Sequence, residues 1–163
     1  MTPTSTSHNR PRVALFPGSF DPFTIGHHSI VQRALPIFDR IVIAIGVNGA
    51  KRSMFSAEQR LEMISALYRD EPRVEVVCYE CLTVELARQH NADFILRGVR
   101  MIADFEYEKN LAEVNRALDG IETVLLYTLP EHSHISSSIV RELIHYGRDV
   151  AACLPPGMTL PEV

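Results

Sequence analysis

Along the chain, short apolar runs alternate with longer segments in which apolar residues recur at helical spacing. The short runs, rich in β-branched residues, predict buried parallel strands. The longer segments predict amphipathic helices that bury one face. Strands are expected at residues 13–16, 41–47, 74–78, 94–96 and 123–129, and helices at residues 27–38, 56–68, 84–90, 104–118 and 136–146. This alternation predicts the α/β class, with a doubly wound, Rossmann-like five-stranded parallel sheet and helices on both faces.

Local signals refine two of these helices and bound the domain. Ser56 and Gln59 form a capping-box pair at the start of the second helix, and Pro36 is expected to disturb the last turn of the first. Residues 1–12 are polar and lack an apolar signal-peptide core, so they are expected to form a loose N-terminal lead-in. Because no repeat or linker divides residues 13–163, they are predicted to form a single domain with its own core.

Composition and charge argue against several classes of protein. Hydrophobic residues make up 46% and charged residues 22% of the chain, a globular balance without a large disordered fraction. The apolar runs are shorter than the roughly 20 residues that span a bilayer, so no membrane partner is expected and the cytoplasm is the predicted location. The net charge of −4 argues against nucleic acid as a partner, and any anionic ligand must be held by local charge.

The three cysteines include one pair, Cys78 and Cys81, with CxxC spacing. That spacing can be redox-active or supply half of a zinc site. A structural zinc site usually needs four ligands and the chain has no second pair, while Cys78 ends a strand-like run instead of opening a helix. We therefore favour ordinary thiols and predict no metal held by the protein itself, with redox and metal roles as less favoured alternatives.

Ligands of doubly wound sheets bind beyond the carboxyl ends of the strands, and residues 17–27, PGSFDPFTIGH, lie there after the first strand. Gly18 is expected to allow a sharp turn, and Ser19 offers a hydroxyl at the same place. Gly26 and His27 open a helix whose N-terminal dipole favours a phosphate, and an imidazole there can donate to a phosphate oxygen in the transition state. A tight turn with a helix-capping histidine is the alternative.

Loops after the second and fifth strands add a basic and a serine-rich element. Lys51 and Arg52 lie in a glycine-containing loop, where a lysine supplies a mobile charge for a phosphate dianion. Solvated loop charge is the alternative there. Ser136, Ser137 and Ser138 precede an apolar helix, and N-capping would account for one or two of them. Because helix N-termini also bind anions, capping and phosphate binding are compatible.

Two further cations follow the fourth strand. Arg97 and Arg100 flank Gly98, which is expected to allow close approach of the backbone to a ligand. Guanidinium groups hold phosphate oxygens through paired N–H donors, so this segment also suits an anionic ligand. Structural ion pairs with Asp104 or Glu106 are the alternative.

Taken together, these strings resemble one family in order and spacing. GSFDPFTIGH is similar to the (H/T)xGH signature of the nucleotidyltransferase superfamily, and with RGVR, ADFEYE and ISSS it resembles the phosphopantetheine adenylyltransferase family in particular. That family usually has threonine where this chain has Ser19, which keeps the hydroxyl. The resemblance implies transfer of the adenylyl group of ATP to 4′-phosphopantetheine, giving dephospho-coenzyme A and pyrophosphate in the penultimate step of coenzyme A synthesis.

The resemblance also implies roles for individual residues. The catalytic residues would be His27, as transition-state stabiliser, Lys51 and Arg100. The acceptor would contact Ser19, Lys51, Thr83 and Arg97. ATP would contact Ser19, Phe20, His27, Gly98, Val99, Arg100, Glu108, His132, Ser133, His134, Ile135, Ser136, Ser137 and Ser138. His132 stands where some members of the family carry tryptophan. Mg²⁺ carried with ATP, a homohexamer and feedback binding of coenzyme A are further expectations from the family.

Other functions stay open at this point. Related transferases that act on nicotinate mononucleotide or glycerol 3-phosphate share the Gly-His and serine-rich elements, but RGVR with ADFEYE points away from them. A non-catalytic nucleotide-binding regulator would be favoured if the histidine or the basic loop were missing, and both are present. A dinucleotide-dependent oxidoreductase is disfavoured because no GxGxxG follows the first strand.

Overall fold

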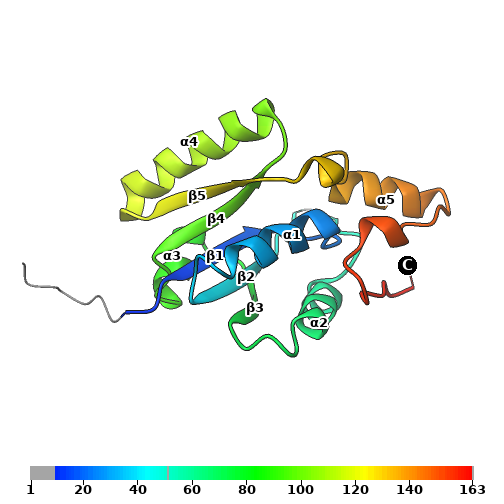
Figure 1. Ribbon diagram of the computed structural model, residues 1–163, viewed down its shortest axis with the longest axis horizontal. Helices are drawn as coiled ribbons and strands as arrows, with labels where there is room; N and C mark the ends of the chain where they lie inside the picture. The colour runs from blue at the N-terminus through cyan, green and yellow to red at the C-terminus, as the bar shows by residue number, and fades with distance from the viewer. Residues whose placement is uncertain (1–9, 51, 163) are drawn as a thin grey trace, which may run out of the picture.

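The computed structural model describes residues 10–50 and 52–162, and it is built on a five-stranded parallel sheet (Figure 1). The strand order is β3-β2-β1-β4-β5, so the chain lays strands outward from β1 on one side before crossing to the other. The strands are β1 (Val13–Gly18), β2 (Arg40–Gly46), β3 (Val74–Tyr79), β4 (Phe94–Val99) and β5 (Glu122–Tyr127). The predicted doubly wound α/β fold is confirmed.

The helices begin and end where local chemistry dictates. They are α1 (Ile25–Ala34), α2 (Ala57–Leu67), α3 (Thr83–Gln89), α4 (Ile102–Asp119) and α5 (Ser137–His145), with 3₁₀ turns η1 (Pro130–His132) and η2 (Ala151–Cys153). The C-cap of α1 is Leu35, directly before Pro36, because Pro36 has no N–H with which to continue the helical hydrogen bonds. At the start of α2, Ser56 accepts from the Gln59 N–H and Gln59 accepts from the Ser56 N–H, which confirms the capping box.

The two faces of the sheet pack against different helices. Ile41, Ile43 and Ile45 of β2 pack with residues of α1 and α2, whereas Val42 and Ala44 pack with residues of α3. Helix α4 contacts β4, β5 and α3, and Figure 1 shows it on the opposite side of the sheet from α2. This arrangement follows from right-handed crossovers, which change face when the direction of strand addition reverses. Helices on both faces were predicted and are confirmed.

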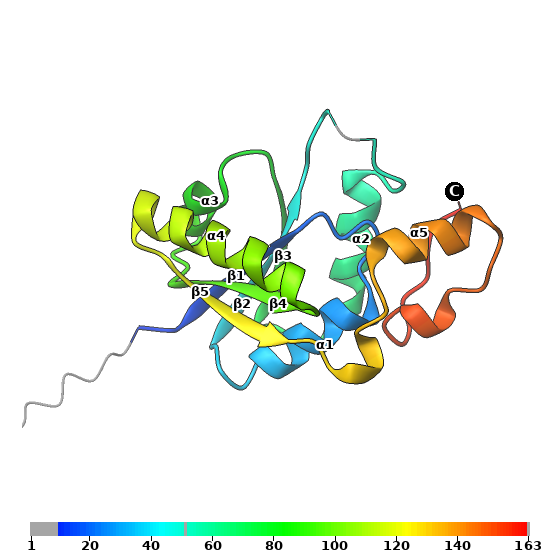
Figure 2. The same ribbon diagram turned by 90° about the horizontal axis from the view of Figure 1, so that it is seen from above.

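A crevice forms where that reversal occurs, between β1 and β4. Strand β1 pairs with β2 along its whole length, but with β4 only at Ala14↔Phe94 and Leu15↔Ile95. Beyond these positions the two strands part, and Pro17 has no N–H with which to continue the pairing. Figure 2 shows α5 beyond the carboxyl ends of the strands, so this end of the sheet gathers β1, β4 and the start of α5.

Strand β4 is longer than the sequence indicated, and this changes the interpretation of its glycine. Arg97 and Gly98 were expected just after a strand but lie within β4, paired with Leu125 and Leu126 of β5. A Cβ at Gly98 would lie 3.2 Å from the Cγ1 atom of Ile30 in α1. Gly98 therefore allows a helix to approach the sheet closely, a packing requirement that the sequence pattern did not reveal.

Gly18 also differs from its expected role as the residue that turns the chain. The left-handed residue of this segment is Phe20, with φ of 48°, and Gly18 is the last residue of β1. A Cβ at Gly18 would lie 2.8 Å from the ring of Phe20. The glycine is thus required because the ring folds back over it, while Phe20 takes the backbone conformation that turns the chain.

Two further expectations concern membranes and cysteines. No described helix is both long and apolar enough to cross a membrane. Cys78 and Cys81 are free and exposed, and residues 10–50 and 52–162 contain no cluster of His, Cys, Asp and Glu that could hold a metal ion.

The close approach of Ile30 to Gly98 generates a stability prediction. We expect Gly98→Ala to lower the free energy of unfolding by about 1–3 kcal/mol, because the added methyl group overpacks the α1–β4 contact. In an Ile30→Ala background, which removes the opposing side chain, the same change should cost much less. Chemical denaturation of the two single variants and the double variant measures this coupling. If the double variant loses the sum of the two single losses in unfolding free energy, the Ile30–Gly98 contact is not the cause of the destabilisation.

Candidate active site

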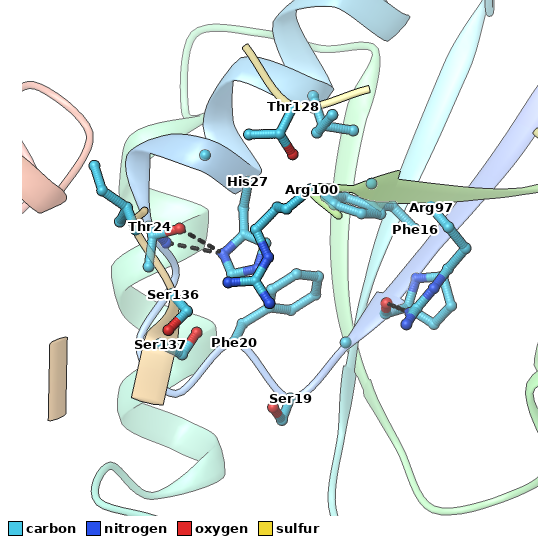
Figure 3. Close-up of a pocket in the computed structure, with 16 residues that line it drawn as sticks. Phe16, Ser19, Phe20, Thr24, His27, Arg97, Arg100, Thr128, Ser136 and Ser137 are labelled. Carbon is cyan, nitrogen blue, oxygen red and sulfur yellow. Dashed lines mark hydrogen bonds between the residues drawn. The ribbon is translucent and has the colours of Figure 1, made fainter. Parts of the chain in front are cut away.

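A cavity of about 230 Å³ opens at the crevice between β1 and β4. Figure 3 shows Arg97 and Ser19 on its β1–β4 side, Ser136 and Ser137 on its α5 side, and His27 and Arg100 between them. The walls come from five segments: β1 and its following loop, the start of α1, the end of β4, the residue after β5, and the start of α5. The lining residues are Phe16, Pro17, Gly18, Ser19, Phe20, Thr24, Gly26, His27, Ile30, Arg97, Gly98, Arg100, Thr128, Ile135, Ser136 and Ser137.

His27 is held in one orientation by the residue that caps its helix. The backbone N–H of Thr24, the N-cap of α1, donates to His27 Nδ1 at 3.0 Å, and the Thr24 hydroxyl lies 3.1 Å from the same nitrogen. A backbone N–H can only donate, so Nδ1 must accept and the ring proton of neutral His27 must be on Nε2. The imidazole therefore presents an N–H donor from Nε2, away from the bond that orients it.

His27 is neutral at ordinary pH. Burial, together with the positive charges of Arg97 and Arg100, lowers the pKa of His27 to about 3. The aromatic rings around it explain the low polarity of its surroundings: Phe20 packs edge-on at 5.1 Å between ring centroids, and Phe23 lies at 5.3 Å. The ring is thus a fixed, uncharged hydrogen-bond donor, suited to stabilising negative charge and unsuited to general acid catalysis near neutral pH.

Arg97 lies in the opening between the two strands. Its guanidinium forms a two-pronged ion pair with Glu108 of α4, with Nε–Oε2 at 2.8 Å and Nη2–Oε1 at 2.7 Å. Its third nitrogen, Nη1, donates to the carbonyl oxygen of Pro17 at the end of β1. The side chain is thereby fixed at the cavity wall. The alternative of a structural ion pair is realised, but with Glu108 instead of Asp104 or Glu106.

Arg100 is held less tightly. Asp104, one turn along in α4, accepts from the Arg100 backbone N–H at 3.0 Å and from its Nε at 3.1 Å. Both side chains are partly exposed, with 32% and 26% of their surfaces accessible. The expected alternative, an ion pair with Asp104, is therefore present, and Arg100 lines the cavity at the same time.

The serines at the start of α5 do different things. Ser136 is the N-cap and accepts from the Ile139 N–H at 3.2 Å, whereas Ser137 donates to the carbonyl of Pro22 at 2.8 Å. Ser138 accepts from Arg141 and does not line the cavity. Capping thus explains one serine, as expected, and the helix N-terminus faces the cavity through Ser136 and Ser137.

A second, smaller cavity of about 80 Å³ lies on the α4 side of Arg97. Arg97 lines both cavities, so its guanidinium marks the boundary between them. Among the described residues, Thr123 Oγ1 is the buried side-chain polar atom that has no hydrogen-bond partner, and Thr123 lines this second cavity. The other lining residues are Pro17, Thr83, Ile95, Glu108, Leu111, Ala112 and Asn115.

The predicted site residues therefore divide into groups. Ser19, Phe20, His27, Arg97, Gly98, Arg100, Ile135, Ser136 and Ser137 line the first cavity. Thr83 and Glu108 line the second cavity, where Glu108 pairs with Arg97. Val99, His132, Ser133, His134 and Ser138 line neither cavity. Lys51 lies outside the described residues.

Sequence reasoning missed residues that act on the site through backbone groups. Thr24 fixes the tautomer of His27, and its place within the TIGH string could have indicated this. Asp21 is buried and accepts from the backbone N–H groups of Met54 and Phe55, which ties the first loop to the start of α2. Arg60 is buried and donates to the carbonyl of Ser19 at 2.6 Å. No local pattern distinguishes Arg60 from an ordinary surface residue of an amphipathic helix.

The electrostatics of the first cavity favour an anion. Its described lining contains two arginines, a neutral imidazole N–H donor and a helix N-terminus, with no carboxylate. Fixed donors and positive charge in a partly enclosed space are the environment in which phosphate charge is best stabilised. This arrangement supports the binding of a phosphorylated ligand at the carboxyl end of the sheet.

Comparison with known proteins agrees with this geometry. The cytidylyltransferase-like family model matches residues 15–143. The chain is 55% identical over 149 residues to a phosphopantetheine adenylyltransferase of Phocaeicola vulgatus, covering 91% of this chain and 99% of that protein. It is 55% identical over 148 residues to the Porphyromonas gingivalis W83 protein of the same name, covering 91% and 97%. It is also 53% identical to that of Flavobacterium johnsoniae, covering 88% and 95%. The chain belongs to the phosphopantetheine adenylyltransferase family.

Proposed function

We propose that this protein transfers the adenylyl group of ATP to 4′-phosphopantetheine, giving dephospho-coenzyme A and pyrophosphate. The observation that carries the proposal is the orientation of His27 in a cation-lined cavity, with its Nε2–H as a neutral donor. Family membership supports the choice of substrates, since the relatives carry the name of this activity.

The reaction needs little covalent chemistry from the protein. The terminal phosphate of the acceptor attacks the α-phosphorus of ATP in line, a new P–O bond forms, and the bond to pyrophosphate breaks. Because a phosphate oxygen is already ionised at neutral pH, no general base and no covalent enzyme intermediate are required. The protein brings two mutually repelling anions together and stabilises the charge that develops between them.

Arg97 would hold the acceptor phosphate, because it stands where the two cavities meet. The remainder of the acceptor would then extend into the second cavity, where Thr83, Asn115 and the unpartnered hydroxyl of Thr123 offer polar contacts to its amide groups. Ser19 would lie between the reacting groups. The part of Lys51 in acceptor binding stays a prediction from the sequence.

ATP would occupy the first cavity. His27 would donate to the α-phosphate as charge builds up, and Arg100 with the N-terminus of α5 would hold the phosphates that leave. The adenine contacts proposed for residues 132–135 rest on the family resemblance, and η1 packs His132 near Gly26 of α1. Mg²⁺ would travel with ATP, since the described cavity lining offers it no carboxylate and Mg²⁺ is often held mainly by phosphates and water.

The same family expectations extend to assembly and location. Helix α4 leaves several large apolar side chains exposed, including Ile102 at 79%, Val114 at 53% and Leu118 at 61%. Exposed apolar side chains of this size favour association, and we propose that α4 contributes to a homohexamer. Feedback binding of coenzyme A and action in the cytoplasm belong to the same proposal.

Substrate identity can be tested by measuring pyrophosphate release from MgATP with 4′-phosphopantetheine. We expect release with this acceptor together with formation of dephospho-coenzyme A, since Arg97 stands where the two cavities meet and can hold the acceptor phosphate. Nicotinate mononucleotide with ATP, and glycerol 3-phosphate with CTP, serve as controls. Pyrophosphate release with only one of the control acceptors would support nucleotidyl transfer but assign a different acceptor. No release with any of the three acceptors would favour a nucleotide-binding regulator.

Replacement of His27 tests its role in the transition state. We expect His27→Ala to lower kcat by about 10²–10³-fold while leaving ATP affinity nearly unchanged, because the contact strengthens only as charge develops. His27→Gln, whose amide N–H₂ can approach the position of Nε2–H, should recover part of the loss. Steady-state kinetics and direct ATP titration measure the two effects, and a kcat of His27→Ala within about threefold of wild type would contradict the assignment.

The hydroxyl of Thr123 provides a test of the second cavity. Thr123→Val keeps the shape and removes an unpartnered buried polar group, so stability should be unchanged or higher by up to about 1 kcal/mol. The acceptor KM should rise about 3- to 10-fold, as expected for one lost hydrogen bond, with the KM for ATP unchanged. Thermal unfolding and paired KM measurements check both parts. An unaltered acceptor KM would place the acceptor arm elsewhere.

A further inference from the structure

Arg60, in the first turn of α2, is a buried cation whose partners are backbone carbonyls. Its side chain is 3% exposed. Nε donates to the carbonyls of Phe55 and Ser56 at 3.1 and 3.3 Å, and Nη1 to those of Ser19 and Gly46 at 2.6 and 3.2 Å. Within residues 10–50 and 52–162 it forms no ion pair with an acidic side chain.

These carbonyls belong to three segments that meet beside the active-site cavity. Ser19 follows β1, Gly46 ends β2, and Phe55 precedes α2. Burying a guanidinium without a carboxylate carries a large desolvation cost, which an apolar side chain in the same place would avoid. The value of Arg60 therefore lies in the geometry that its bonds impose, and the shortest of these bonds goes to Ser19.

The bond to Ser19 sets the direction of the Ser19–Phe20 peptide. In a planar trans peptide the C=O and the following N–H point in opposite directions. Since the Ser19 carbonyl points at Arg60, which does not line the cavity, the Phe20 N–H points away from Arg60, and Ser19 and Phe20 both line the cavity. No acceptor for this N–H exists among the described residues, which leaves it available to a phosphate oxygen.

The backbone at Phe20 needs such support. Its φ of 48° is left-handed, a region that large side chains adopt at an energetic cost unless surrounding contacts fix them. Asp21 holds the following residue, because its carboxylate accepts from the Met54 and Phe55 N–H groups at 2.9 Å. The Phe55 N–H thus donates to Asp21, and the Phe55 carbonyl accepts from Arg60. Arg60 also donates to the Ser19 carbonyl, so these hydrogen bonds link Asp21 to Ser19.

We propose that Arg60 is a positioning residue for adenylyl transfer: by holding the Ser19 carbonyl, it turns the Phe20 N–H and the Ser19 hydroxyl toward the transferred phosphoryl group. Arg60 lies outside the cavity lining and acts through the Ser19–Phe20 peptide. This role rests on the proposed function, because the N–H donor matters only if a phosphoryl group reacts beside it.

The test compares Arg60→Met and Arg60→Lys with a matched control, Arg40→Met. Arg40 also donates to a backbone carbonyl, that of His90 at 2.6 Å, but it stands at the amino end of β2, away from the cavity. With MgATP and 4′-phosphopantetheine, at a temperature where circular dichroism shows each variant folded, Arg60→Met should lower kcat by about 10- to 100-fold. Arg60→Lys, which keeps donors for the same carbonyls, should lose less, and Arg40→Met should stay within about twofold of wild type.

A crystal structure of the Arg60 variant with bound ATP supplies a readout that a purely stabilising residue would not change. In Arg60→Met the Ser19–Phe20 peptide should be rotated, and the Phe20 N–H should no longer meet a phosphate oxygen. If Arg60→Met fails to fold, Arg60→Lys serves in its place, with a smaller rotation and a smaller loss of kcat. An unrotated peptide, or a folded Arg60 variant with wild-type kcat, overturns the proposal. If the wild-type protein is inactive with every acceptor, the proposed function is refuted instead. The crystal structure would still show whether the Ser19–Phe20 peptide rotates in the Arg60 variant.

Discussion

The separation of β1 from β4 beyond two paired positions is the constraint on which the site depends. The sheet reverses its direction of growth at this point, so no crossover helix covers the gap at the carboxyl ends of the two strands. Pro17 cannot continue the pairing, and Arg97 occupies the opening by donating to the Pro17 carbonyl. The fold therefore provides a cavity between two strands that are each paired along their length with their other neighbour, β1 with β2 and β4 with β5.

Charge in this cavity is arranged so that the basic groups stay available to a ligand. Glu108 and Asp104 fix the orientations of Arg97 and Arg100, but neither carboxylate lines the first cavity. Burial, together with the positive charges of the same two arginines, lowers the pKa of His27 and keeps it uncharged. An uncharged donor held by Thr24 stabilises a developing anion through a hydrogen bond and transfers no proton, which suits a reaction whose nucleophile is already ionised.

Much of the architecture was predictable because it depends on periodicity and local chemistry. Strand and helix types follow the apolar spacing, Pro36 limits α1, and Ser56 with Gln59 starts α2. The residues that line the first cavity were mostly found as well, because loops at the carboxyl ends of parallel strands converge. What the sequence did not reveal are contacts between distant residues: Gly98 makes room for Ile30, Gly18 makes room for the ring of Phe20, and Glu108 pairs with Arg97.

The sequence by itself determined the order of the elements, the family, and the kinds of side chain gathered at one end of the sheet, since these are properties of spacing and composition. Tertiary structure alone decided the protonation of His27, the partner of Arg97 and the direction of the Ser19–Phe20 peptide. Each of these depends on burial, or on a bond such as that between Arg60 and Ser19, whose partners lie 41 positions apart in the chain. The spacing of residues along the chain does not indicate which distant residues will be in contact, because these contacts form only when α2, β1 and β4 pack together.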